Sequence, residues 1–315
     1  MPTALNRPAT TEPSNVAHET SDRSTSNLLD WAVLVLPGTI WGASFLFIAD
    51  GLEALPPDGI TFLRFVFGFL TLSMIPGARR TVLPSDRAGI AWLGVLWLAF
   101  PMSMFPHAEQ HVSSALTGML NGAVPLIATG VAVVATRRLP SRAVLLGLAV
   151  GAGGVVLMAL PGINAGSNSA RGITLIAAAL LSYGVAINLA RPLQERNGAL
   201  PVVWRALAVA ALVTMPLGAP ALLNAHWSPR PFLAVLALGV LGTAVASAVM
   251  AVAVGRLGAS RASATAFFMP IVALFLGVVV RGERVAGVAV GGVALCLAGA
   301  WLVRRGAFPN SIREA

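Results

Sequence analysis

Long apolar runs alternate with short polar connections along almost the whole chain. Each run continues for about 20 residues without the period-two alternation of a strand, which predicts helices long enough to cross the ~30 Å hydrocarbon core of a bilayer. A helix also satisfies its backbone polar groups internally, as lipid requires. We therefore predict an all-α integral membrane fold with ten transmembrane helices, at residues 31–49, 59–76, 88–106, 112–135, 143–161, 172–190, 199–223, 232–255, 262–280 and 285–303.

The second half of the chain repeats features of the first at a fixed offset. The segment Leu93-Gly94-Val95-Leu96 recurs as Leu238-Gly239-Val240-Leu241, and the matching pairs further on are Pro125 with Pro270, Gly147 with Gly292 and Gly154 with Gly299. Five predicted helices make up each copy, and an odd number of crossings turns the second copy upside down in the membrane. We therefore expect two inverted-topology five-helix repeats, residues 31–161 and 172–303, between a disordered cytoplasmic tail at 1–30 and a cytoplasmic tail at 304–315.

Composition agrees with a membrane protein and indicates its orientation. Of 315 residues, 57% are hydrophobic and 10% are charged, whereas a soluble domain has about 25% charged residues. All 21 basic residues are arginines. They lie between the apolar runs instead of forming one patch, which argues against nucleic-acid binding. If both termini lie in the cytoplasm, most arginines fall on the cytoplasmic side, as the positive-inside rule requires. We therefore expect a multi-pass protein of the cell membrane with cytoplasmic N- and C-termini.

The residue types that many enzymes need are missing or badly placed. Without lysine, the chain has no P-loop and no Schiff-base chemistry. The four histidines lie in the tail or near the expected outer turns, so no base reaches a serine inside a span. His107 and His111 have metal-ligand spacing, but one turn offers at most three ligands. We expect no enzyme activity, no cofactor and no resident metal, and the single cysteine, Cys296, excludes an internal disulfide.

Several short motifs follow one another in a characteristic order. They are Trp41-Gly42-Ala43-Ser44-Phe45 in the first span, Arg64 early in the second, Pro125 and Pro270 in the fourth and ninth, and Gly282-Glu283-Arg284 before the glycine-rich tenth. Over residues 31–305 the chain resembles the EamA-type ten-helix members of the drug/metabolite transporter superfamily. Such proteins commonly carry a second glutamate at the end of the fourth span, where this chain has Arg138.

The resemblance implies a secondary transporter that works by alternating access. Its cargo would be a small metabolite, an amino acid or a related amphipathic compound, and export is the expected direction. Two alternatives stay open: a flippase for a lipid-linked cargo, and a membrane sensor without net flux. The expected partners are the small-molecule substrate and the lipid bilayer.

Five side chains are candidates for substrate binding. Trp41 and Tyr183 hold equivalent positions in the two halves and would flank a central cavity, unless they serve ordinary helix packing. Arg64 would pair with an anionic group or would extend toward the membrane interface as an anchor. Thr117 and Asn121 lie on one face of the fourth span.

Two prolines and four titratable groups are candidates for moving parts. Pro125 and Pro270 each free a carbonyl one turn back and would act as hinges, or as fixed kinks. No ionisable residue other than arginine lies in the middle of a span, so the candidates for ion coupling lie at span ends. They are His107, Glu109 and His111, which would otherwise form a solvated turn, and Glu283.

Two small-residue motifs predict close helix contacts. Gly147-x-x-x-Gly151 lies in the fifth span and Gly287-x-x-x-Gly291 in the tenth. This pattern lets two helix backbones approach each other. It serves either packing within one chain, which we favour, or a homodimer.

Overall fold

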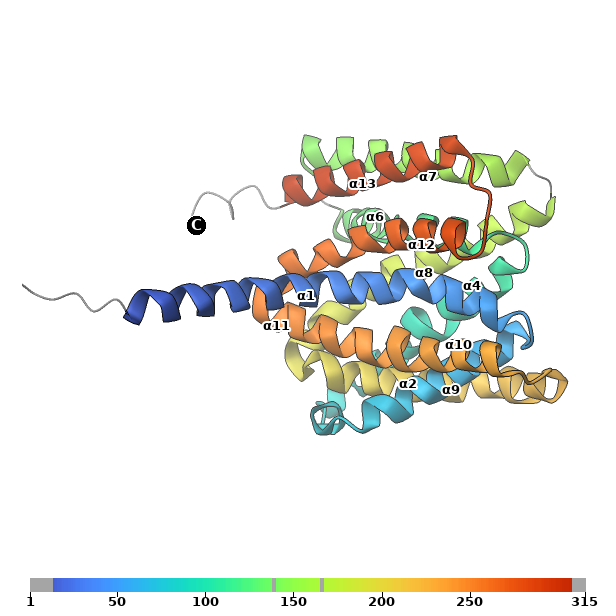
Figure 1. Cartoon of the computed structure of the whole chain (residues 1–315), viewed down its shortest axis with the longest axis horizontal. Coiled ribbons are helices and arrows are strands. Elements are labelled where there is room, and N and C mark those ends of the chain that lie inside the picture. Colours follow the sequence, from blue (N-terminus) through green and yellow to red (C-terminus); the bar gives the residue numbers. More distant parts are fainter. Residues whose placement is uncertain (1–13, 138–139, 165–166, 308–315) are drawn as a thin grey trace, which may run out of the picture.

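The computed structural model describes residues 14–137, 140–164 and 167–307, and the secondary structure of these residues is helical (Figure 1). Each of the ten apolar runs is helical. The α-helices are α1 (Ser14–Gly51), α2 (Pro57–Ser73), α3 (Arg87–Leu93), α4 (Phe100–Glu109), α5 (Ser114–Asn121), α6 (Val124–Thr136), α7 (Arg142–Asn164), α8 (Ser167–Asn197), α9 (Ala199–Ala221), α10 (Pro229–Gly239), α11 (Ala246–Ala262), α12 (Phe268–Val279) and α13 (Gly287–Ala307).

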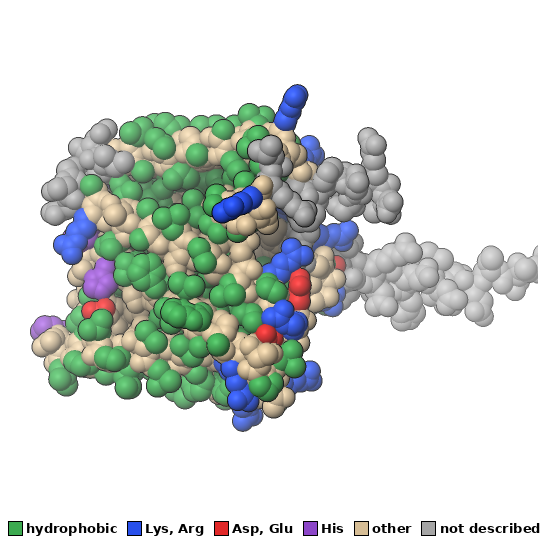
Figure 2. All heavy atoms as spheres, turned by 180° about the vertical axis from the view of Figure 1, so that it is seen from behind, with side chains coloured by type: hydrophobic (Ala, Val, Ile, Leu, Met, Phe, Trp, Pro, Cys, Tyr) green, Lys and Arg blue, Asp and Glu red, His purple; other side chains and the backbone are tan. Residues whose placement is uncertain are grey.

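Eight helical segments of the described residues are long and apolar enough to cross a membrane. The two remaining runs form shorter helices, α2 with 17 residues and the segment Ser263–Val279. Hydrophobic side chains cover most of the visible flank, and arginines gather near the end at which the termini leave the bundle (Figure 2). In lipid, such an apolar flank is the stable surface. The protein is therefore an all-helical, multi-pass membrane protein.

The start of α1 and the end of α13 lie at the same end of the bundle (Figure 1). We call this the terminal end, and we call the opposite end, where α1 finishes at Gly51, the cavity end. Residues 14–30 are helical, which differs from the expected disorder of residues 1–30. Adding a residue to an existing helix costs much less free energy than nucleating a new helix, so the helix formed by the apolar part of α1 extends toward the N-terminus. Residues 1–13 and 308–315 lie outside the described residues.

Four of the ten runs depart from regular α-helix along their length. The third and eighth contain π-helical segments, η3 (Gly94–Ala99) and η5 (Val240–Val245), at matching places in the two halves. The fourth is divided into α5 and α6 just before Pro125, and in the ninth a 3-10 segment, η6 (Ser263–Phe267), precedes Pro270. A proline near a helix start needs no intrahelical donor, which explains its position after each break. Pro125 and Pro270 therefore lie in the first turns of α6 and α12.

Glycines bring α7 and α13 into backbone contact. A Cβ on Gly147 would lie 2.8 Å from the carbonyl oxygen of Gly299, and one on Gly292 would lie 2.7 Å from that of Gly154. Only residues without a side chain allow this approach. By contrast, a Cβ on Gly291 would meet open space. Gly147 thus packs within the chain, but its partners lie on a different face of α13 from the expected Gly287-x-x-x-Gly291 motif.

Candidate functional site

A cavity of about 290 Å³ lies at the cavity end of the bundle. It is bounded by the end of α1, the turn between α4 and α5, and the connection from α12 to α13. Its polar lining is rich in charge for a membrane protein and consists of Glu53, Glu109, Ser113, Ser114, Arg281 and Glu283. Charged groups inside a membrane protein are costly and mark functional sites. This cavity is therefore the first place to look for a binding function.

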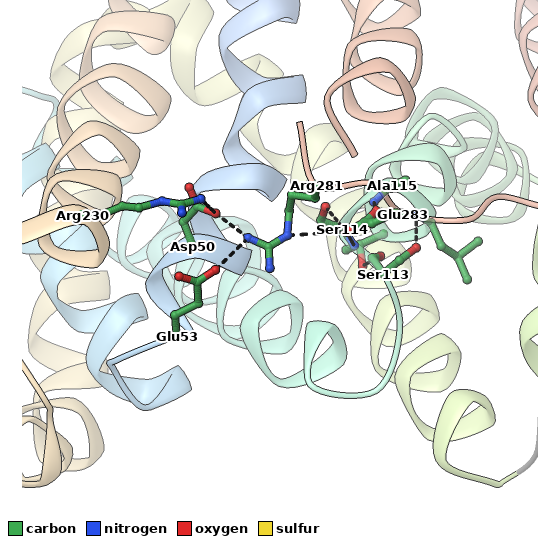
Figure 3. A network of polar contacts seen from close by, with 10 residues as sticks. Asp50, Glu53, Ser113, Ser114, Ala115, Arg230, Arg281 and Glu283 are labelled. Carbon is green, nitrogen blue, oxygen red and sulfur yellow. Dashed lines mark hydrogen bonds and ion pairs between the residues drawn. The ribbon is translucent and has the colours of Figure 1, made fainter. Parts of the chain in front are cut away.

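Arg281 ties three elements together beside the cavity (Figure 3). Its Nη1 donates to Asp50 Oδ1 and, over 3.2 Å, to Glu53 Oε1, both at the end of α1. Its Nε lies 3.8 Å from Glu283 Oε1, and Asp50 also accepts from Arg230 of α10 over 3.2 Å. We call these five residues the arginine clasp. It links α1, α10 and the segment after α12.

Glu283 joins the same segment to the start of α5. Its Oε1 accepts from the backbone N of Ser114 over 3.0 Å and from Ser114 Oγ over 2.7 Å, and its Oε2 accepts from the N of Ala115 over 2.8 Å. The first amides of a helix have no intrahelical acceptor and carry a partial positive charge, so a carboxylate stabilises them. Glu283 is therefore a helix cap supplied by a distant part of the chain.

Glu109 is the last residue of α4 and points into the bundle. Both of its carboxylate oxygens are buried, and neither has a hydrogen-bond partner among the described residues. It lies one helical turn after the buried Phe105, on the same face. The expected span ended at residue 106 and placed Glu109 in an outer turn. The helix instead continues to Glu109, and this turns its side chain toward the cavity.

The two histidines near Glu109 contact other helices. His107 Nε2 lies 3.0 Å from Asp58 Oδ1, near the start of α2, with both side chains about one-third exposed. His111 packs beside Gly172 of α8, because a Cβ on that glycine would lie 3.1 Å from the Cβ of His111. The structure therefore separates the three candidates, and of these three only Glu109 lines the cavity.

Arg64 lies in the interior and not at an interface. It is 5% exposed, and its Nε donates to Thr243 Oγ1 of η5 over 2.9 Å. Thr243 Oγ1 in turn donates to the carbonyl of Leu238 over 3.1 Å. Among the described residues Arg64 has no ion pair, but it is close enough to Glu109 and Tyr183 for electrostatic interaction. By contrast, the guanidinium of Arg205 lies over the ring of Trp204.

Trp41, Thr117 and Asn121 occupy buried contacts of α1 and α5. Trp41 Nε1 donates to the carbonyl of Gly242 in η5 over 3.1 Å. Asn121 Nδ2 donates to Met269 Sδ over 2.7 Å, and its Oδ1 is buried without a partner in the described part of the chain. Thr117 is fully buried and donates back within its own segment. Trp41 and Arg64 thus meet η5, whereas Asn121 meets α12.

Tyr183 belongs to a row of aromatic rings between α1, α4 and α8. Its ring centroid lies 6.0 Å from that of Phe105, which lies 5.6 Å from that of Phe45 in an edge-on arrangement. Sequence reasoning identified only Tyr183, because a phenylalanine in an apolar run looks like any core residue. The three rings join α1, α4 and α8 in the interior of the bundle.

A second hollow lies on the flank and is almost entirely apolar. It has a volume of about 730 Å³ between α6, α7 and α8 and is lined by side chains such as Ile127, Val131, Leu148, Val155 and Leu181. It offers no charged group. It is therefore suited to hydrocarbon and not to a soluble cargo.

Comparison with known proteins identifies the chain. A model of the EamA-like transporter family matches it twice, at residues 31–160 and 170–305. The chain belongs to the EamA-like transporter family. This EamA-like protein is 27% identical over 280 residues to a protein of Streptantibioticus cattleyicolor named "Probable terminal-alkyne amino-acid exporter", and the match covers 87% of this chain and 93% of that protein.

Two further comparisons extend this result. The EamA-like chain is 28% identical over 259 residues to the "Uncharacterized inner membrane transporter YedA" of Escherichia coli strain K12, covering 78% of this chain and 80% of that protein. A solved crystal structure shares the fold, with a TM-score of 0.56 and 19% identity over 86% of this chain and 98% of its own. The sequence-based family assignment is confirmed: this is a membrane transporter of small compounds, consistent with the expectation that it is not an enzyme.

Proposed function

We propose that this EamA-like protein is a secondary transporter that exports an amino acid or a related amphipathic metabolite by alternating access. One structural observation supports the proposal most strongly: Arg64 is buried in an apolar bundle, both carboxyl oxygens of Glu109 are buried as well, and no ion pair joins the two residues. Such groups are expensive in a membrane and are retained where a ligand uses them. The printed name of the Streptantibioticus cattleyicolor relative, an amino-acid exporter, supports this class of cargo.

In this proposal all ten helical runs cross the membrane as two inverted halves. A helix of 17 residues such as α2 reaches the lower limit for a span. The double family match, the matching π segments η3 and η5, and the common end for both termini support two equivalent halves and an even number of crossings. The arginine pattern of the sequence supports cytoplasmic termini, and we propose that the protein lies in the cell membrane.

The cargo would bind between the halves, in contact with Trp41, Arg64, Thr117, Asn121 and Tyr183. Trp41 and Arg64 both bond to η5, where a π-helical turn is easier to rearrange than a regular helix. The helix breaks before Pro125 and Pro270 would serve as hinges, and opening the arginine clasp would connect the site with the cavity end.

For ion coupling, the structure favours one candidate over the other three. Glu283 is engaged with α5, His107 with Asp58, and His111 lies against α8. Glu109 is the candidate whose oxygens are buried without a partner among the described residues. Of the four candidates, Glu109 is therefore the one that is available to bind a cation.

The test is a metabolite panel. Cells that overproduce the protein, cells with an empty vector and cells with the Arg64→Ala variant are compared for excreted compounds and for tolerance of added amino acids. Excretion of at least one amphipathic amino acid should rise with the native protein and fall to the vector level with the variant, at equal membrane abundance. Identical panels for native protein and vector would reject the proposal.

The apolar flank hollow favours a second candidate, a flippase for a lipid-linked cargo. A hydrocarbon chain fits its lining, whereas the charged cavity would hold a polar headgroup. Proteoliposomes with fluorescent lipid in one leaflet distinguish the two functions. Exchange of the lipid between leaflets without export of any soluble amino acid would favour the flippase.

A further inference from the structure

Two opposite charges are buried near each other without being in contact. Arg64 of α2 and Glu109 of α4 lie on helices that pack together, and each is within electrostatic range of the other. No ion pair joins them among the described residues. Within the described part of the chain, Arg64 has Thr243 as its single, neutral hydrogen-bond partner, and the carboxyl oxygens of Glu109 have none.

In the described residues, neither side chain has the ion pair and the full set of hydrogen bonds that normally stabilise a buried ionisable group. An ionised side chain in a low-dielectric interior is stable when it is paired and hydrogen-bonded. The terminal guanidinium nitrogens of Arg64 and both oxygens of Glu109 have unused hydrogen-bonding capacity toward the described residues. A buried guanidinium and a buried carboxyl group with unused hydrogen-bonding capacity suit a molecule that carries both a carboxylate and an ammonium group.

The neighbouring charges are already occupied. Arg281 donates to Asp50 and Glu53, and Glu283 accepts from Ser114 and Ala115. These groups hold the helix ends together and are not available without breaking the clasp. Arg64 and Glu109 are the pair that is buried, close and without an ionic partner in the described residues.

We propose that Glu109 binds the ammonium group of the cargo and Arg64 its carboxylate, so that the site selects zwitterions. The inference rests on the proposed function and deepens it. Glu109 lines the cavity and receives the cation there. Arg64 lies about two helical turns after the start of α2, which is roughly 10 Å along the helix axis. The carboxylate would therefore bind deeper in the bundle than the ammonium group. Tyr183, near Arg64 and beside Phe105, forms the wall for the cargo side chain.

The test measures binding of matched compounds to the full-length protein in lipid nanodiscs. The probes are norvaline, leucine and phenylalanine, each with the acid that lacks its amino group and the amine that lacks its carboxylate. For norvaline these are pentanoate and butylamine. At least one amino acid should bind about tenfold more tightly than both of its counterparts, because each charged hydrogen bond contributes on that scale. Equal affinity within all three series would overturn the inference.

Single substitutions test which residue binds the ammonium group of the cargo and which binds its carboxylate. Glu109→Gln should remove the preference for the amino acid over the acid that lacks the amino group, and Arg64→Gln the preference over the amine. Glu109→Asp and Arg64→Lys keep the charges and should restore part of each preference. Matched controls are Glu195→Gln, an exposed residue paired with Arg191, and Arg205→Gln. Both controls should leave the preferences unchanged.

Three outcomes separate this inference from the proposed function. If Glu109→Gln weakens an amino acid and its deaminated acid by the same factor, Glu109 does not bind the ammonium group and the inference falls. If the cells export only uncharged or singly charged compounds, the inference also falls but the transporter stands. If no compound of the metabolite panel is exported, the proposed function itself fails.

Discussion

The carboxylate of Glu283 accepts hydrogen bonds from the backbone N and the Oγ of Ser114, a residue 169 positions earlier in the chain. The segment after α12 is thereby fastened to the beginning of α5. Since Arg281 lies two residues before Glu283 and reaches α1, one short connection fixes three helix ends.

Removing the cap should destabilise the protein. In Glu283→Ala the first amides of α5 lose their acceptor, and we expect a loss of about 1–2 kcal/mol of stability. Glu283→Gln keeps one acceptor oxygen and should lose less. Thermal unfolding in detergent measures both, and Glu195→Ala, which removes an exposed glutamate paired within its own helix, is the control. An equal melting temperature for native protein and Glu283→Ala would show that the cap carries no stability.

Breaking the arginine clasp should open the cavity. Arg281→Gln leaves Asp50 and Glu53 without their shared partner, and the like charges at the end of α1 then repel. The readout is the rate at which a membrane-impermeant maleimide labels a cysteine placed at Leu52, which lines the cavity, in a Cys296→Ser background. Labelling should become faster in Arg281→Gln and should not change in Arg284→Gln, whose side chain lies outside the clasp. Unchanged labelling in Arg281→Gln would mean that the clasp does not limit access.

Much of the fold follows from hydrophobic periodicity alone. Ten apolar runs predict ten helices, and all ten are helical, because burial in lipid leaves the chain no other way to satisfy its backbone. The sequence also predicts hinges or kinks at Pro125 and Pro270, since proline removes a donor wherever it stands. What periodicity misses is the exact end of a helix. The three residues from His107 to Glu109 decide whether a glutamate faces solvent or a cavity.

The candidate site is less accessible to sequence reasoning for a related reason. Arg64 is conspicuous because charge is rare in a span, but its partner Thr243 is an ordinary residue in the second half of the chain. The link from Glu283 to Ser114 joins two segments that no local pattern connects. Tertiary pairing of polar groups has no periodic signal. The sequence therefore indicates which residues are unusual, and the structure shows which of them meet.

Asn121 should contribute to transport and little to folding. Its Nδ2 contacts Met269 Sδ, and its Oδ1 is buried without a partner among the described residues, as expected for a group that awaits a ligand. Asn121→Ala should reduce export of the cargo found by the metabolite panel about tenfold or more, the effect of losing a buried polar contact. Membrane abundance should stay at the native level. Asn224→Ala, at an exposed position in η4 (Leu222–Asn224), is the matched control. Native export by Asn121→Ala would exclude the residue from the site.

Glycine contacts should decide whether α7 and α13 pair within one molecule. Gly154→Val places a side chain against the backbone of α13, where Cys296 and Gly292 leave no room, and overpacking of this kind costs about 1–3 kcal/mol or more. Gly291→Val points into open space and should be tolerated. The measurement is the yield of monodisperse protein in size-exclusion chromatography. A homodimer built on the Gly291 face would reverse the pattern, with Gly291→Val shifting the oligomeric state.

Opposite membrane sides for residues 80 and 225 are the most direct consequence of ten crossings. Arg80 follows α2, which starts at the cavity end and runs toward the terminal end, whereas Ala225 lies at the cavity end, since the neighbouring His226 N donates to the carbonyl of Ala54 over 2.9 Å. If α2 crosses the membrane despite its 17 residues, reporter fusions after these positions must give opposite signals. An alkaline phosphatase fusion should be active after Ala225 and inactive after Arg80, and a green fluorescent protein fusion should show the reverse. Equal signals at both positions would remove one crossing, and with it the inverted relation of the two halves on which alternating access depends.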